Sequence, residues 1–144
     1  MKNMLETLRS YAETGKYRRV PVSRELYADA FTPVEVMRTL RAASRHCYLL
    51  ESAEDKQRWG RYSFLGYAPT MEITCTDGHV TIAEGAEEED KKRKEFDTDH
   101  PGEVLREILR DYKSPVVEEM PPFTGGLVGY FSYEYIKYAE PSLK

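Results

Sequence analysis

Apolar residues recur at helical spacing in three stretches of the chain. Near the N-terminus, the apolar stripe consists of Met4, Leu5, Leu8, Tyr11 and Ala12. Gly15 follows this stripe, and a glycine just beyond a helix favours the left-handed conformation that ends it. The pattern therefore predicts a first helix over residues 4–12.

The second stretch carries the clearest helix start in the chain. Thr32 precedes Pro33, and Glu35 lies three positions after the threonine. Threonine and glutamate at this spacing form a capping box, and proline suits the first helical turn. The apolar stripe that follows consists of Val36, Met37, Leu40 and Ala43. We predict a helix from Pro33 to near Ser44.

The third helical stretch begins at Pro101. Its apolar stripe consists of Leu105, Ile108, Leu109 and Tyr112. These positions share the spacing of a core-facing helix surface, so we predict a helix that Pro101 opens. Three later prolines, Pro115, Pro121 and Pro122, break the chain after it.

Short apolar and β-branched runs predict the strands. Residues 47–52 and 62–67 have the pattern of two strands. Both faces of the first are apolar, which is typical of an inner strand covered on both sides. Residues 72–83 predict a hairpin, because two β-branched runs flank Asp77-Gly78, the favoured pair for a type I′ turn.

Two further stretches are predicted to be extended. In residues 17–26, Pro21 marks an edge or first strand position. Residues 124–136 predict a long strand rich in glycine and aromatic residues. The pattern Gly125-Gly126-x-x-Gly129 lies inside this run and not in a turn leading into a helix, so it does not indicate a phosphate-binding loop. We expect Gly129 to make room for a bulky side chain or a ligand ring, and the aromatic residues Tyr130, Phe131 and Tyr133 to lie mainly in the core.

Residues 84–95 form a block of charge, acidic first and then basic. The block offers little apolar surface to bury apart from alanine, which favours a mobile loop. Its basic half could touch a polyanion, but a solvated loop whose charges offset one another is the favoured interpretation.

Together these elements predict an α+β domain in which antiparallel strands form a sheet and helices pack against it. The length of 144 residues suits a single domain, and the net charge of −4 gives no general attraction to nucleic acid or anionic membrane. No apolar run suits a membrane span or a signal peptide, so we expect a cytoplasmic protein. Cys47 and Cys75 are expected to be buried, reduced thiols, with a disulfide between them as the less favoured alternative.

Catalytic constellations are missing from the sequence. His46, His79 and His100 are scattered, and none has metal-ligand spacing. No nucleophile motif is present either. We therefore predict no catalytic residue and no metal ligand in this chain.

Two motifs far apart in the sequence carry a family resemblance. The first is Leu49-Leu50-Glu51-Ser52, followed by Gly60-Arg61-Tyr62-Ser63-Phe64-Leu65-Gly66, and the second is the run PPFTGGLVGYFSYE over residues 121–134. Together they resemble the N-terminal region of anthranilate synthase component I, a family of tryptophan biosynthesis that acts on chorismate. The stretches Val20-Pro21-Val22, Ala28-Asp29 and Thr32-Pro33-Val34 fit the same family.

The resemblance implies that residues 1–144 are the N-terminal domain of a larger chorismate-utilising enzyme. The catalytic chorismate-binding region would lie outside this chain and would hold the Mg²⁺ ion. The full enzyme, a lyase, would convert chorismate and ammonia into anthranilate and pyruvate, and a glutamine amidotransferase subunit (component II) would supply the ammonia. We expect the natural chain to continue beyond Lys144, the present chain alone to be inactive, and its uncovered apolar face to favour self-association.

The same resemblance implies a regulatory site. In the family, the serine of the Leu-Leu-Glu-Ser motif contacts the feedback inhibitor tryptophan, and that serine is Ser52 here. The residues alone favour a simpler role for Ser52, a backbone hydrogen bond at a strand end. Glu51 could bind an amino group or form a salt bridge at the sheet end, and Arg61 could pair with a ligand carboxylate, pair with Glu51 or cap a helix. With Tyr62, these residues are the candidate tryptophan-binding set.

Two rival interpretations remain at this stage. Aminodeoxychorismate synthase component I, of folate biosynthesis, shares the fold and chorismate, but residues 20–22, 49–52 and 60–66 look more like the tryptophan branch. A stand-alone small-ligand-binding module would need a complete pocket and a defined C-terminus, which this sequence does not indicate.

Overall fold

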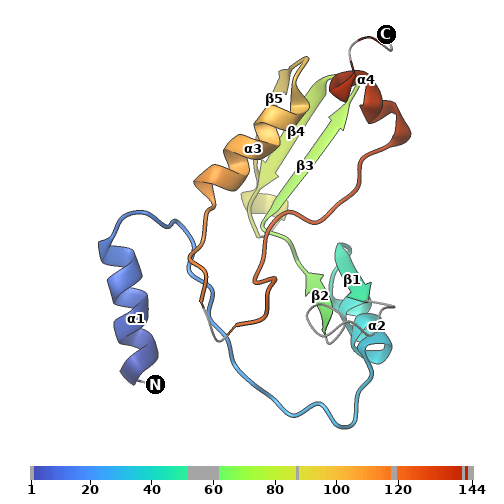
Figure 1. Ribbon diagram of the computed structural model, residues 1–144. Coiled ribbons are helices and arrows are strands. Elements are labelled where there is room, and N and C mark those ends of the chain that lie inside the picture. Colours follow the sequence, from blue (N-terminus) through green and yellow to red (C-terminus); the bar gives the residue numbers. More distant parts are fainter. Residues whose placement is uncertain (1, 52–61, 87, 118–119, 141, 143–144) are drawn as a thin grey trace. The chain divides into compact units, whose positions relative to one another are not determined.

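The computed structural model describes residues 2–51, 62–86, 88–117, 120–140 and 142. It is an α+β structure, which confirms the predicted class (Figure 1). The chain divides into two compact units, one formed by Met1–Leu26 and Gly102–Gly129 and the other by Tyr27–Pro101 and Tyr130–Lys144.

The first unit contains two of the predicted helices, α1 (Lys2–Glu13) and all but the first residue of α3 (Pro101–Asp111). Gly15 has a φ of +62°, and its N–H donates to the carbonyl of Ala12 at 3.2 Å. This left-handed turn ends α1 as the sequence predicts.

The predicted extended stretch over residues 17–26 does not become a strand. Within the part of the chain that the structure describes, it belongs to neither sheet. The guanidinium groups of Arg18 and Arg19 lie 4.8 and 5.2 Å from the centre of the Tyr112 ring. Cation–π contacts therefore hold the start of the segment, while Val22 and Leu26 are 61% and 75% exposed.

The predicted long strand over residues 124–136 is also wrong. Residues 124–132 form no helix or strand, and the chain then enters the short 3₁₀ helix η2 (Tyr133–Tyr135) and α4 (Ile136–Ala139). The predicted core aromatics are instead exposed, Tyr130 by 92%, Phe131 by 63% and Tyr133 by 86%. An apolar run forms a strand only where a partner strand completes its backbone hydrogen bonds, and the sequence pattern does not show where that partner is.

Gly129 does not make room for a bulky neighbour, contrary to the sequence-based expectation. A Cβ built at Gly129 would meet no atom of the described residues within 4 Å. Gly125 and Gly126 have φ values of +137° and +150°, which few residues other than glycine adopt. In this structure, these two glycines serve the backbone path and not a close contact.

In the second unit, the predicted capping box starts α2 (Pro33–Ala43). The backbone N–H of Thr32 donates to Glu35 Oε2 at 2.8 Å, and the N–H of Glu35 donates to Thr32 Oγ1 at 3.3 Å. The helix ends at Ser44, whose N–H donates to the carbonyl of Leu40 at 2.8 Å. Both predicted ends of this helix are confirmed.

Replacing Thr32 by alanine should lower the free energy of unfolding by about 1 kcal/mol, because the first turn of α2 loses its side-chain acceptor. Thr39→Ala is the matched control, since the Thr39 hydroxyl donates to a carbonyl of its own helix, that of Glu35 at 3.3 Å, and not to the cap. Urea denaturation of both variants measures the difference, and an equal loss in the two would contradict the role of the cap.

The capping box should also make stability depend on pH. The hydrogen bond from the Thr32 backbone, and then that from its hydroxyl, hold the pKa of Glu35 below its ordinary value of 4.5. A carboxylate with a lowered folded-state pKa stabilises the fold above its unfolded pKa, and this contribution is lost as the pH falls through the folded pKa. We expect Glu35→Gln to be less stable than the wild type at neutral pH and to approach it in acid, as measured by unfolding at a series of pH values.

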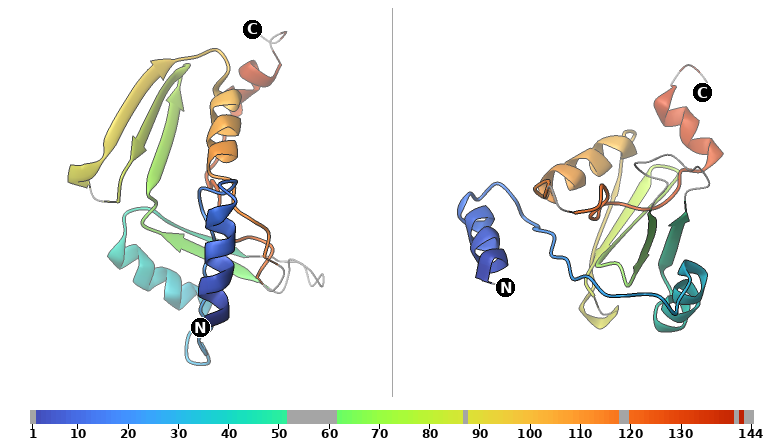
Figure 2. Two further views of the ribbon diagram at one scale, coloured as in Figure 1. Left: turned by 90° about the vertical axis from the view of Figure 1, so that its left-hand side faces the viewer. Right: turned by 60° about the horizontal axis from the view of Figure 1, so that its bottom comes forward.

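The second unit holds two antiparallel sheets (Figure 2). In the smaller one, β1 (Cys47–Glu51) pairs with β2 (Ser63–Tyr67), and α2 contacts both strands. The two strands match the sequence prediction, but β1 is not an inner strand. In the described part of the chain it pairs only with β2, and Leu50 is 48% exposed.

The larger sheet has the order β3-β4-β5, with β3 at Met71–Thr76 and β4 at His79–Glu84. Asp77 and Gly78 connect β3 and β4 with φ values of +50° and +85°, as a type I′ turn requires. The buried core of the described residues lies on β4, where Val80 is 1% and Ala83 is 8% exposed.

The charge block is not a mobile loop throughout, because its basic half forms β5 (Lys92–Asp97) at the edge of this sheet. Residues 88–90 form the short 3₁₀ helix η1 (Glu88–Asp90) before it. Charged side chains suit an exposed edge strand, where the backbone ladder and not side-chain burial provides the stability. The Lys94 ammonium also lies 5.1 Å from the centre of the Phe96 ring.

The strand assignment predicts slow hydrogen exchange in a segment that looks solvated by composition. Alternate amides of β5 should be protected, because an antiparallel strand directs every second N–H to its neighbour. Amides of residues 18–20 and 22–24, which belong to no sheet, should exchange quickly and serve as the internal reference. Exchange of all six β5 amides at the rate of that reference would show that the block is a loop after all.

The turn between β3 and β4 is tied to α4. Lys137 Nζ donates to Asp77 Oδ1 at 3.1 Å, and this hydrogen bond raises the pKa of Lys137. The carbonyl of Gly78 accepts the N–H of Thr98 at 2.9 Å. The turn is therefore fixed on one side by the end of β5 and on the other by the last helix.

Candidate functional site

The candidate site residues lie where β1 ends and β2 begins. Glu51 is the last residue of β1 and pairs with Ser63, the first residue of β2, and Tyr62 directly precedes that strand. This register brings Glu51 and the start of β2 to the same end of the small sheet (Figure 1). The other two candidates, Ser52 and Arg61, lie outside the described residues.

Glu51 is exposed at this sheet end. Its neighbour Leu50 pairs with Phe64 and is itself 48% exposed. Consecutive strand residues project to opposite faces of a sheet, so the Leu50 side chain and the Glu51 carboxylate lie on different faces. The exposed carboxylate can form a charged hydrogen bond with an ammonium group.

Tyr62 is half-buried and lies against the side chain of Phe64. Their ring centroids are 5.8 Å apart, with an angle of 36° between the planes. This separation is within the range of favourable aromatic pairs. The pair forms an aromatic surface at the start of β2, on the face of the sheet that Phe64 shares with Leu50. Glu51 pairs with Ser63, so its side chain belongs to the opposite face.

Gly66 has a structural role that the sequence analysis missed. It is the register partner of Tyr48 on β1, and a Cβ at Gly66 would stand 2.6 Å from Tyr48 Cζ. The tyrosine ring therefore occupies the space over the glycine, a cross-strand arrangement known to support glycine in sheets. The signal in the sequence is a glycine within a strand pattern, but the identity of its partner depends on the register.

Two of the three histidines, His46 and His79, have carboxylate neighbours. His79 Nδ1 lies 2.8 Å from Asp97 Oδ1, and His46 Nε2 lies 3.9 Å from Glu72 Oε2. Among the described residues, no group of three or more His, Cys, Asp or Glu residues is arranged to hold a metal ion. The donor groups of this part of the chain thus do not fit Mg²⁺.

The helices give no indication of a membrane segment. None of those in the described ranges is long and apolar enough to cross a bilayer.

Comparison with known proteins identifies the relatives of the chain. Over 134 residues it is 34% identical to anthranilate synthase component 1 of Acinetobacter calcoaceticus. The matched region covers 91% of this chain and 26% of that protein. The chain is homologous to the N-terminal quarter of anthranilate synthase component 1. The resemblance that the sequence motifs indicated is therefore confirmed.

Other proteins with the name anthranilate synthase component 1 agree. The one from Pseudomonas aeruginosa is 38% identical over 128 residues, covering 88% of this chain and 25% of the relative. The one from Aquifex aeolicus is 34% identical over 139 residues, covering 95% of this chain and 26% of the relative. The chain thus spans about a quarter of the length of these curated relatives. No family model and no solved structure matches the chain.

Proposed function

We propose that this chain is the N-terminal regulatory part of an anthranilate synthase component 1 and forms one wall of a tryptophan feedback site. The observation that carries the proposal is the intact Leu49-Leu50-Glu51-Ser52 motif in a chain homologous to the N-terminal quarter of that enzyme. The first three motif residues form the end of β1, beside the aromatic start of β2.

Residues 1–144 would be the N-terminal domain of the full protein, with the chorismate-binding catalytic region in the remaining three quarters. The full enzyme would convert chorismate and ammonia into anthranilate and pyruvate. The catalytic region would supply the Mg²⁺ ligands, since the described residues offer no suitable group.

Tryptophan presents an ammonium group, a carboxylate and an indole ring, and the candidate residues offer a partner for each. The exposed carboxylate of Glu51 suits the ammonium, and the guanidinium of Arg61 suits the carboxylate. The ring of Tyr62, already paired with Phe64, offers an aromatic surface for the indole. This surface belongs to the face of the sheet opposite Glu51, so a ligand that contacts both would lie across the end of the strands. Ser52 would be the main hydrogen-bonding contact, and the rest of the pocket would come from the catalytic region.

The proposed partners follow from the same assignment. A glutamine amidotransferase subunit would deliver ammonia to the full enzyme, which we place in the cytoplasm. The exposed aromatic residues Tyr130, Phe131 and Tyr133 support association of the isolated chain with itself or with the catalytic region. The net charge of −4 supports neither a nucleic acid nor an anionic membrane as partner.

The folate-branch enzyme aminodeoxychorismate synthase component I is the alternative. The relatives from Acinetobacter, Pseudomonas and Aquifex all carry the name anthranilate synthase component 1. This favours the tryptophan branch, and a protein that made aminodeoxychorismate and not anthranilate would reverse the assignment.

The isolated chain should form no anthranilate from chorismate, ammonia and Mg²⁺, because the residues that would bind substrate and metal are proposed to lie in the other three quarters. The product is fluorescent, so a fluorescence assay of the pure chain beside the full-length enzyme is the measurement. Turnover by the pure chain would show that a catalytic centre lies within residues 1–144.

A further inference from the structure

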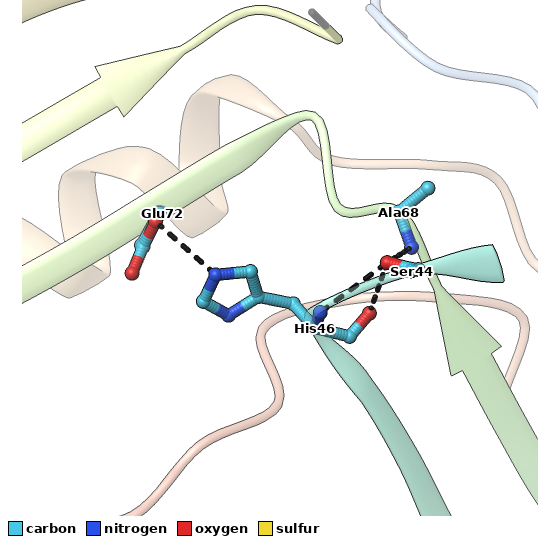
Figure 3. Close-up of polar contacts among 4 residues, drawn as sticks. All are labelled: Ser44, His46, Ala68 and Glu72. Carbon is cyan, nitrogen blue, oxygen red and sulfur yellow. Dashed lines mark hydrogen bonds and ion pairs between the residues drawn. The ribbon is translucent and has the colours of Figure 1, made fainter. Parts of the chain in front are cut away.

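At the opposite end of the β1–β2 pair, one hydroxyl group forms hydrogen bonds with both sides of the ladder. Ser44 Oγ donates to the carbonyl of His46 at 2.8 Å and accepts the N–H of His46 at 3.3 Å (Figure 3). It also accepts the N–H of Ala68, from the other side of the ladder, at 3.1 Å. A serine hydroxyl has one donor and two acceptor positions, so these contacts use all of its hydrogen-bonding capacity.

The residue that Ser44 holds has an unusual backbone conformation. Ala68 has a φ of +46°, in the left-handed region that residues other than glycine seldom adopt. Its N–H is shared between Ser44 Oγ at 3.1 Å and the carbonyl of His46 at 3.2 Å. A strained residue persists only where its surroundings fix it, and here these two acceptors are part of what fixes it.

Ala68 stands at the corner between the two sheets of the second unit. It follows Tyr67, the last residue of β2, and only Pro69 and Thr70 separate it from Met71, where β3 begins. Across the same corner, His46 Nε2 lies 3.9 Å from Glu72 Oε2 of β3 (Figure 3). The corner is therefore joined to the segment before β1 by the Ser44 hydroxyl, the His46 carbonyl and the His46 ring.

Ser44 also ends α2, since its N–H donates to the carbonyl of Leu40 at 2.8 Å. One residue thus connects the end of α2, the start of β1 and the corner after β2. Two-stranded sheets are marginally stable alone, so their register depends on what fastens their ends. In this sheet, Ser44 fastens the end next to the pair Cys47 and Tyr67, and the candidate site lies at the other end, beyond the pair Glu51 and Ser63.

We propose that Ser44 is a positioning residue for the inhibitor site, which it serves by fixing Ala68 and thereby the placement of β1 against β2. This inference rests on the proposed tryptophan site at Glu51 and Ser52. A hydroxyl seven residues before the strand end at Glu51 then controls where that end lies, although it does not touch the ligand.

The test uses the full-length enzyme. Ser44→Ala should raise the tryptophan concentration for half inhibition about threefold or more, with the uninhibited rate unchanged. Ser44→Thr, which keeps the hydroxyl on a side chain suited to the extended backbone at this position, should stay within about twofold of the wild type. Ser10→Ala is the matched control, because the Ser10 hydroxyl bonds a backbone carbonyl in α1 at 2.7 Å and should not affect inhibition.

A double variant tests whether Ser44 affects inhibition through the position of the strands or only through the stability of the fold. Ala68→Gly removes the strain of the left-handed residue, so the double variant Ser44→Ala/Ala68→Gly should regain thermal stability. The weakened inhibition should remain, because glycine does not restore the contact with Ser44. Recovery of both properties together would show that Ser44 acts through stability alone and would overturn the proposal.

The remaining outcomes are also decisive. Wild-type tryptophan sensitivity in Ser44→Ala, with sensitivity lost in Ser52→Phe, would reject the positioning role while the inhibitor site stands. Wild-type sensitivity in Ser52→Phe would remove the site and this inference with it. If Ser44→Ala does not fold, Ser44→Cys replaces it, because a thiol has nearly the same shape but hydrogen-bonds weakly. Unchanged sensitivity in a folded Ser44→Cys enzyme would then count against the proposal.

Discussion

Replacing Ser52 by phenylalanine in the full-length enzyme should nearly abolish inhibition by tryptophan and leave the uninhibited rate close to normal. The larger side chain would occupy ligand space, and the hydrogen bond of the serine would be lost as well. Ser52→Ala removes only the hydrogen bond, which contributes about 1 kcal/mol, so it should raise the half-inhibitory concentration about fivefold. Inhibition curves of the two variants, each beside its uninhibited rate, give both numbers.

The control for this experiment is Ser10→Phe, a change of the same size at an exposed serine of α1. It should leave the inhibition curve unchanged. Unchanged sensitivity in Ser52→Phe would reject the assignment of Ser52. Loss of activity together with folding would support the simpler role, in which Ser52 only makes a backbone hydrogen bond at the strand end.

Gly66→Ala should lower the free energy of unfolding by about 1–3 kcal/mol, the usual cost of forcing an added methyl group into occupied space. The new Cβ would stand 2.6 Å from Tyr48 Cζ and 2.9 Å from the Tyr48 hydroxyl oxygen, so the ring must move. Gly129→Ala is the matched control, since a Cβ there would meet no described atom within 4 Å. Its effect should stay within about 0.5 kcal/mol.

Chemical denaturation of the purified chain measures both variants. In a Tyr48→Ala background, Gly66→Ala should lower the free energy of unfolding much less than it does in the wild type. The ring that the added methyl group would displace is then absent. Equal stabilities for Gly66→Ala and Gly129→Ala would show that the Tyr48 ring adapts freely, and the contact would then have no energetic importance.

Local signals in the sequence were enough for the elements whose stability is local. The capping box at Thr32 and the turn at Asp77-Gly78 depend on residues at most three positions apart, and the structure has both where the pattern predicts them. The fold class follows from these elements and the short strands.

Features that depend on distant partners were predicted poorly. The run over residues 124–136 has the composition of a strand, but in this chain it pairs with nothing described and Tyr130 is 92% exposed. For the basic residues of β5 the sequence predicted a loop and the structure has a strand. Backbone pairing with β4 makes a strand of a segment that has little to bury. The sequence shows which segments are able to pair or to bury apolar surface, but it does not show whether or where a partner for them exists.

The same limit applies to the candidate site. Ser52 was found through a family resemblance, and Glu51, Arg61 and Tyr62 were added from their chemistry and their place near it. The types and spacing of these residues alone favour simple structural roles. Gly66 and Ser44 could not be singled out from the sequence, because their importance arises from Tyr48 across the ladder and from Ala68, which lies 24 positions along the chain from Ser44.

Direct titration of tryptophan tests the central claim that the Leu49–Ser52 motif contributes to a regulatory tryptophan site. Calorimetric titration of L-tryptophan into the full-length enzyme should show saturable binding, and the same titration of Ser52→Phe should show none, while the variant still turns over chorismate. Tryptophan binding of unchanged affinity in the active Ser52→Phe enzyme would contradict the claim.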